Sequence, residues 1–99
     1  NIHPSLLPKF PGLNTHQKAI ESSEKVHGVS VHFVTAKLDG GPVIAKETVS
    51  IDPTDNATTL ANKVLQKEHI LYPKVIQWYT QKRLKLIDES TATLDGKVL

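Results

Sequence analysis

Apolar and polar residues alternate along residues 29–35, where the sequence reads Val-Ser-Val-His-Phe-Val-Thr. This period of two predicts a strand with one apolar face and one polar face. A second strand is expected over residues 43–51, and the turn sequence Asp39-Gly40-Gly41 between the two has the conformational freedom for a chain reversal. The pattern therefore predicts an antiparallel β-hairpin with Asp39 near its tip.

Apolar residues at helical spacing predict one long helix in the second half of the chain. These residues are Leu60, Val64, Leu71, Val75, Trp78 and Tyr79. Pro73 lies inside this stretch, and proline lacks a backbone N–H and crowds the preceding turn. We therefore expect the helix to be interrupted or kinked at Pro73.

The remaining segments are shorter. Three prolines keep residues 1–13 out of regular helix and stiffen them as an extended loop. Asn14 or Thr15 is expected to cap a short helix that ends near residue 23. Residues 83–88 and 94–98 are candidate strands. The predicted fold class is α/β, with a hairpin and short strands packed against the long helix in a single unit, residues 1–99.

Composition narrows the possible functions. Twelve basic and ten acidic residues are interspersed and give a net charge of +2, so no basic patch indicates nucleic acid or an anionic membrane as a partner. There is no cysteine, which excludes disulfides and a thiolate nucleophile and agrees with a cytoplasmic location. No apolar run approaches the ~20 residues that span a bilayer. The spacing of the five histidines matches no zinc motif, and we expect no metal.

Three residues on constrained loops combine an amide, an imidazole and a carboxylate: Asn1, His3 and Asp39. These groups suit acyl transfer without a covalent intermediate, because the amide can donate to an oxyanion while the imidazole moves a proton. Each of these residues also has a purely structural alternative. His3 could be a loop histidine bonded to the backbone, and Asn1 and Asp39 could be turn residues. Ser30 and His32 project from one strand face, either as a hydrogen-bonded pair or as support for Asp39.

Three motifs carry a resemblance to a known family. They are Asn-Ile-His-Pro-Ser-Leu-Leu-Pro at 1–8, Pro-Gly-Leu-Asn-Thr-His at 11–16 and Leu-Asp-Gly-Gly-Pro at 38–42. The first is shared by enzymes that use 10-formyltetrahydrofolate, including methionyl-tRNA formyltransferase and formyltetrahydrofolate deformylase. The other two resemble the phosphoribosylglycinamide formyltransferase family in particular, and the resemblance runs from Asn1 to about Leu94.

The resemblance implies a larger fold than these residues can form. Members of the family have an amino-terminal nucleotide-binding half with a glycine-rich phosphate loop, and the five glycines here form no such spacing. We therefore expect residues 1–99 to be the carboxy-terminal, catalytic and folate-binding half of a formyltransferase fold. The missing amino-terminal half would be its partner.

The activity implied by the resemblance is transfer of a formyl group from 10-formyltetrahydrofolate to the amine of glycinamide ribonucleotide, in purine biosynthesis. Asn1 and protonated His3 would hold the tetrahedral oxyanion, and Asp39 would favour the imidazolium. By resemblance, Glu68 and Ile2 contact the ribonucleotide. The folate pocket would be lined by Phe33, Val34, Thr35 and Leu38.

Two other interpretations remain open from the sequence. Water could replace the amine as acceptor, which would make the protein a formyltetrahydrofolate deformylase or another enzyme of the superfamily. Alternatively, the chain could be a non-catalytic binding module or structural fragment. Because it has no phosphate-binding loop to position a ribonucleotide, the 99-residue chain alone is expected to be inactive.

Overall fold

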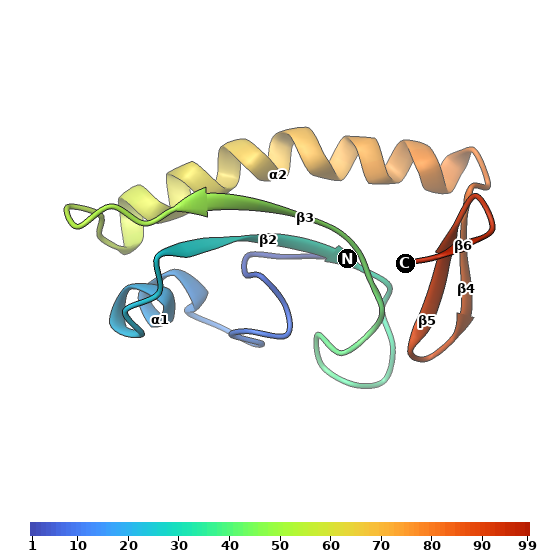
Figure 1. Ribbon diagram of the computed structural model, residues 1–99, viewed down its shortest axis with the longest axis horizontal. Helices are drawn as coiled ribbons and strands as arrows, with labels where there is room; N and C mark the ends of the chain where they lie inside the picture. Colours follow the sequence, from blue (N-terminus) through green and yellow to red (C-terminus); the bar gives the residue numbers. More distant parts are fainter.

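The computed structural model describes residues 1–99 as two three-stranded antiparallel sheets and two helices (Figure 1). In chain order the elements are β1 (Ile2–His3), α1 (Thr15–Glu21), β2 (Val26–His32), β3 (Val43–Ser50), α2 (Ala57–Thr80), β4 (Leu84–Asp88), β5 (Thr91–Leu94) and β6 (Lys97–Val98). The first sheet has the order β1-β2-β3 and the second the order β4-β5-β6. The expectation of a small α/β unit is confirmed.

The predicted hairpin is formed by β2 and β3, which pair antiparallel with Val29 opposite Glu47. β2 begins at Val26 and ends at His32, so it lies three residues earlier than expected at each end. The reversal between the strands is made by residues 33–42, and Phe33 N–H donates to the carbonyl of Pro42 at 3.0 Å. This longer loop carries Asp39 back toward the start of the chain.

The two glycines of this loop do not supply the turn conformation that was expected of them. The residue with a left-handed backbone is Asp39, at φ 48°, whereas neither Gly40 nor Gly41 has a positive φ. Gly41 is required for close approach, because a Cβ at this position would lie 1.8 Å from the carbonyl oxygen of Phe33. Gly41 therefore lets the chain approach closely at the base of the loop, rather than providing an unusual turn conformation.

Helix α2 lies along one face of the first sheet (Figure 1) and closes the main hydrophobic core. The buried members of this core are Val29, Val31, Val64, Leu71, Val75 and Leu84. The helical spacing identified the buried positions of α2 correctly, except at its end, where Tyr79 is 60% exposed. The core holds β2 and β3 rigidly under the helix, which fixes the strand ends that carry the loop residues.

The polar face of β2, opposite to the face that α2 covers, is buried as well. Ser30 and His32 are both almost inaccessible. Ser30 Oγ accepts from the N–H of Leu7 at 3.0 Å and donates to the carbonyl of Ser5 at 2.7 Å. These bonds hold the proline-rich loop over β2, so the polar strand residues act as internal anchors.

The starts of the two helices and the effect of Pro73 on α2 differ partly from the predictions. α2 runs without interruption through Pro73, so the predicted break is wrong, while a kink remains a prediction. Asn56 and Thr59 form a capping box at its start, which was not predicted from the sequence. α1 begins at Thr15, but Asn14 is left-handed at φ 59° and makes no side-chain cap, because capping needs an extended backbone.

The second sheet extends from the end of α2. Its strands turn at Asp95-Gly96, as predicted, and both residues have positive φ. Arg83 donates to both carboxylate oxygens of Asp95, at 2.9 and 2.7 Å. No helix of this structure is both long and apolar enough to cross a membrane.

Candidate active site

The pairing of β1 with β2 sets the direction of the first residues. Ile2 lies opposite Val31, and His3 lies opposite Ser30. Because successive side chains point to opposite faces, the side chain of Ile2 packs against the α2 core and that of His3 faces the other side. His3 is 5% exposed and shares its face with the loop residues.

Asp39 reaches His3 from the 33–42 loop. Its Oδ2 lies 3.5 Å from Nδ1 of His3, and the same oxygen accepts the N–H of Gly12 at 2.8 Å. The carboxylate side chain is 9% exposed. In so buried a place a carboxylate interacts strongly with a nearby imidazolium. The structure therefore brings His3 and Asp39 together, although 36 positions separate them in the sequence.

The second ring nitrogen of His3 also has a partner. Nε2 lies 2.7 Å from the carbonyl oxygen of Phe10, and because a carbonyl can only accept, Nε2 must carry the hydrogen. Neither nitrogen of His3 thus points into open space. Direct donation from His3 to an oxyanion requires the contact with Phe10 to be exchanged for substrate.

The two polar residues of the strand have different partners. The Nδ1 of His32 lies 2.9 Å from the carbonyl oxygen of Phe33, and its Nε2 lies 3.7 Å from Oδ1 of Asp39. Ser30 makes no hydrogen bond to Asp39, since its hydroxyl bonds the backbone of Ser5 and Leu7. Only His32 of this pair is placed to act on Asp39. No three histidine, aspartate or glutamate side chains converge as metal ligands do.

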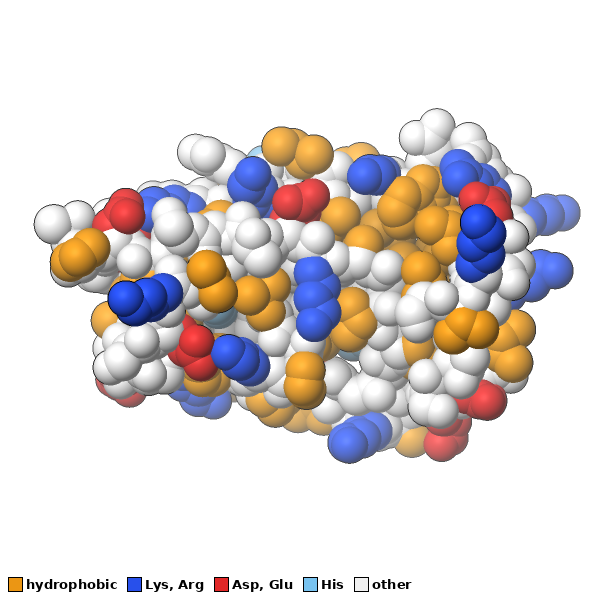
Figure 2. Space-filling model, in the orientation of Figure 1, with side chains coloured by type: hydrophobic (Ala, Val, Ile, Leu, Met, Phe, Trp, Pro, Cys, Tyr) orange, Lys and Arg blue, Asp and Glu red, His pale blue; other side chains and the backbone are white.

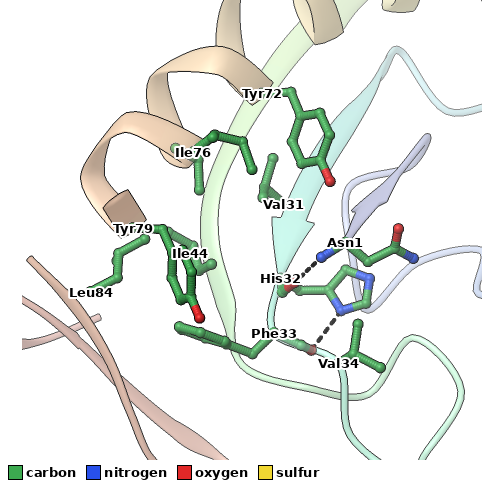
Figure 3. A pocket seen from close by; sticks show the side chains of 11 residues that line it. Asn1, Val31, His32, Phe33, Val34, Ile44, Tyr72, Ile76, Tyr79 and Leu84 are labelled. Atoms are coloured by element: carbon green, nitrogen blue, oxygen red, sulfur yellow. Dashed lines mark hydrogen bonds between the residues drawn. The ribbon is translucent and has the colours of Figure 1, made fainter. Parts of the chain in front are cut away.

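Asn1 lies where two cavities meet. Its backbone nitrogen donates to the carbonyl of His32 at 2.7 Å, which fixes the start of β1 against the end of β2. Its side-chain amide makes no hydrogen bond with the protein and lines both cavities. Figure 3 shows the amide directed away from the bonded backbone nitrogen. The amide is therefore free to donate to a bound ligand.

One cavity, of about 250 Å³, adjoins Asp39. It is lined by Asn1, His32, Val34, Thr35, Ala36, Lys37, Leu38 and Asp39. Three of the four residues expected at the folate pocket belong to this set, namely Val34, Thr35 and Leu38. Val34 and Leu38 are 69% and 74% exposed, and exposed apolar side chains beside a polar cluster are typical of a ligand-binding surface.

The other cavity, of about 260 Å³, is mainly apolar and lies between the end of α2 and the hairpin (Figure 3). Phe33, the fourth expected folate residue, contributes to it together with Ile44, Tyr72, Ile76 and Tyr79. Figure 2 shows apolar side chains gathered at this place, where α2 meets the second sheet. Asn1, His32 and Val34 line both cavities, so an apolar surface continues from the polar cluster toward α2.

Glu68 lies apart from this cluster. It is half-buried on α2, which covers the sheet face opposite to His3 and Asp39. Burial raises the pKa of the Glu68 carboxyl, and His69 partly opposes this effect. The structure therefore does not bring Glu68 or the side chain of Ile2 to the three proposed catalytic groups.

Several contacts of the site were not anticipated from the sequence. The N–H of Gly12 and the carbonyl of Phe10 hold Asp39 and His3, and both come from the proline-rich loop. Tyr72 and Tyr79 line the apolar cavity, although the sequence placed Tyr79 only on the apolar face of the helix. Contacts made by backbone groups cannot be recognised from residue type. A tyrosine at the edge of an apolar helix stripe, in contrast, could have indicated a cavity wall.

Replacing Ser30 with Ala should destabilise the protein by about 1–3 kcal/mol, because the buried Leu7 N–H and Ser5 carbonyl lose their partner. Urea unfolding measures the effect. Exposed Ser90, whose hydroxyl bonds only Asp88, is the matched control, and its alanine variant should change the free energy of unfolding by less than about 0.5 kcal/mol. Equal effects of the two variants would show that Ser30 does not anchor the loop.

A histidine pair that joins α1 to β2, with His16 half-buried and His27 buried, should make stability depend on pH. Nδ1 of His16 lies 3.1 Å from Nε2 of His27. Burial, followed by the nearby His16 and His3, lowers the pKa of His27 from 6.5 to about 4. A folded pKa below the unfolded one means that protonation favours the unfolded chain.

The free energy of unfolding should therefore be fully retained above pH 6.5 and fall by up to roughly 3 kcal/mol toward pH 4, at ~1.4 kcal/mol per unit of pKa difference. Chemical unfolding at a series of pH values measures this slope. His27→Gln, which cannot titrate, should show a flatter profile over the same range. Parallel profiles for the two proteins would contradict this assignment.

This chain is similar to known proteins in sequence and in structure. Residues 1–76 match the model of the family described as Formyl transferase. The chain is 50% identical over all 99 residues to the phosphoribosylglycinamide formyltransferase of Escherichia coli (strain K12), covering 46% of that protein. The solved phosphoribosylglycinamide formyltransferase of Coxiella burnetii superposes with a TM-score of 0.92 at 50% identity, over all of this chain and 46% of the other.

A formyltetrahydrofolate deformylase from Pseudomonas syringae is more distant, with a TM-score of 0.87 and 26% identity over 95% of this chain and 31% of that chain. The chain spans less than half the length of these relatives. Its family match nevertheless includes β1, the hairpin, and the 33–42 loop that brings Asp39 to His3. The chain therefore belongs to the formyl transferase family.

Proposed function

We propose that the protein containing this chain transfers a formyl group from 10-formyltetrahydrofolate to the amine of glycinamide ribonucleotide, in the cytoplasm. The observation that carries the proposal is the meeting of His3 and Asp39 beside a cavity lined by Asn1 and three of the four expected folate residues. Membership of the formyl transferase family and the 50% identity to a phosphoribosylglycinamide formyltransferase support the choice of donor and acceptor.

The reaction needs one bond to form and one to break. The acceptor amine attacks the formyl carbon, which forms the new C–N bond and puts negative charge on the formyl oxygen. Collapse of this tetrahedral species breaks the bond to the folate nitrogen, while one proton moves from the attacking amine to the leaving nitrogen. The chain must therefore stabilise an oxyanion and assist one proton transfer.

Asn1 is the direct oxyanion donor in this proposal, because its amide is unbonded and lines the cavity. His3 contributes as an imidazolium next to Asp39, and it reaches the oxyanion only when substrate displaces the Phe10 carbonyl from Nε2. Asp39 stabilises that imidazolium and can accept a proton from the attacking amine through water. Its burial makes the attraction between the two groups strong.

The folate would bind along the 33–39 segment, where Val34 and Leu38 expose apolar surface and backbone groups line the cavity. Glu68 and the backbone of Ile2 would face the ribonucleotide once the rest of the enzyme is in place. We place this chain in the carboxy-terminal half of the enzyme, with an amino-terminal half that supplies the ribonucleotide phosphate site. The greater length of the relatives is consistent with such a second half.

The test is an assay of the protein expressed from its complete reading frame. With 10-formyltetrahydrofolate and glycinamide ribonucleotide, we expect one formylated ribonucleotide for each folate consumed and almost no formate. Formate release at the same rate with and without the ribonucleotide would instead support a deformylase, the second candidate, which the similarity to a deformylase favours.

The same assay on residues 1–99 alone separates an enzyme from an inactive fragment. We expect no turnover, because positioning two substrates contributes as much as ~7–11 kcal/mol to such reactions and the chain has no glycine-rich phosphate loop. Robust turnover by the 99 residues alone would mean that they bind the ribonucleotide phosphate themselves.

A further inference from the structure

Two polar atoms beside the proposed catalytic pair each lack a hydrogen-bond partner and face one another. The Nε2 of His32 is buried and unpartnered. Oδ1 of Asp39 accepts no hydrogen bond, since the Gly12 N–H goes to Oδ2. The two atoms lie 3.7 Å apart, and their side chains are only 3% and 9% exposed.

The other nitrogen of His32 determines what Nε2 can be. Nδ1 lies 2.9 Å from the carbonyl oxygen of Phe33, which only accepts, so Nδ1 carries a hydrogen. Figure 3 shows this bond, with the opposite edge of the ring turned away from it. In a neutral ring, the buried Nε2 would then present a lone pair to a carboxylate oxygen, and two acceptors facing each other repel.

One additional proton would give a hydrogen-bond partner both to Nε2 of His32 and to Oδ1 of Asp39. Placed on Nε2, it gives Oδ1 of Asp39 a donor and gives Nε2 an acceptor. Shortening the 3.7 Å separation by about 0.7 Å produces an ordinary charge-assisted hydrogen bond. The other charged or titratable groups around His32 are His3, across Asp39, Lys37 on the wall of the cavity beside Asp39, and Tyr72 and Tyr79 on the wall of the apolar cavity.

We propose that His32 is held as an imidazolium that donates Nε2–H to Oδ1 of Asp39, and that it acts as a positioning residue for this carboxylate. His32 fixes Oδ1, so that Oδ2 is turned toward His3 and the Gly12 N–H. The inference deepens the proposed function and rests on it for its kinetic consequence. The protonation state itself can be measured without any activity.

The direct test is nitrogen NMR of the imidazole rings at pH 7 in the protein expressed from its complete reading frame. His32, assigned by the signals that disappear in its variants, should show two protonated ring nitrogens. A ring with an unprotonated Nε2 would overturn the proposal, whether or not the protein transfers formyl groups.

Two substitutions separate positioning from packing. His32→Asn retains a donor close to the position of Nδ1, for the Phe33 carbonyl, and loses the group that reaches Asp39. His32→Gln retains an amide donor near the position of Nε2. We expect kcat to fall about 10- to 100-fold in the Asn variant, with KM changed less than about threefold, because misplacing a catalytic group by ~1 Å costs this much.

The Gln variant should recover kcat to within about fivefold of the wild-type value. Equal losses in the two variants, or a loss confined to KM, would overturn the positioning role. Thermal melting of both variants identifies misfolding, and the wild-type NMR result decides the matter if neither folds. A wild-type protein that makes no formylated product would instead count against the proposed function alone.

Discussion

Replacing Asn1 with Ala is expected to lower kcat by roughly 10²–10³ in the protein expressed from its complete reading frame, as the loss of one oxyanion donor does in other acyl-transfer enzymes. The side-chain amide of Asn1 has no other bond to lose, and the backbone bond to His32 remains in the variant. Folding should therefore be unaffected, and KM should change far less than kcat, because the amide acts mainly on the charge that develops during the reaction.

Steady-state kinetics with both substrates measures this effect. The matched control is Asn62→Ala, which removes an exposed asparagine from α2 and should leave kcat unchanged. Turnover of the Asn1 variant within about a factor of three of the wild-type value would remove Asn1 from the mechanism.

Replacing Gly41 with Ala should affect both stability and turnover. The added Cβ would lie 1.8 Å from the backbone oxygen of Phe33, so the base of the 33–42 loop must open. We expect the free energy of unfolding to fall by more than about 2 kcal/mol. Turnover should fall about 100-fold, since Asp39 lies in the same loop and a displacement of ~1 Å is enough for such a loss.

Gly40→Ala is the control for this prediction. A Cβ at position 40 meets only side-chain atoms of the exposed Lys37, of which Cδ and Cγ can rotate away while Cβ, at 2.9 Å, needs only a small shift. Its cost should stay below about 1 kcal/mol, with turnover close to the wild-type value. Similar losses in the two variants, measured by urea unfolding and kinetics, would show that the close approach at Gly41 does not shape the site.

The hairpin and the long helix were predictable because their patterns are local. Alternation along β2 and helical spacing along α2 each report which face is buried, and the burial of Val29, Val31 and Leu71 agrees with them. The alternation along β2 could not show that its polar face is also buried. Ser30 is covered by the proline-rich loop, which is more than twenty residues away in the sequence. Long-range packing of this kind leaves no periodic signal.

The candidate site was predictable only in part. The resemblance placed Asn1, His3 and Asp39 together, and the structure puts His3 and Asp39 in contact. It did not reveal the left-handed backbone of Asp39, the backbone donor from Gly12 or the acceptor from Phe10, which set the directions of both side chains. These are backbone groups, and their positions depend on how the proline-rich loop folds rather than on residue type.

The most direct test of the account is a crystal structure of the complete protein with glycinamide ribonucleotide and a stable analogue of 10-formyltetrahydrofolate. The account predicts that the formyl oxygen lies ~3 Å from the amide nitrogen of Asn1, with His3 and Asp39 beside the bond to be broken. A formyl group bound more than about 6 Å from Asn1, with no ordered water between them, would contradict the claim that this cluster carries out the transfer.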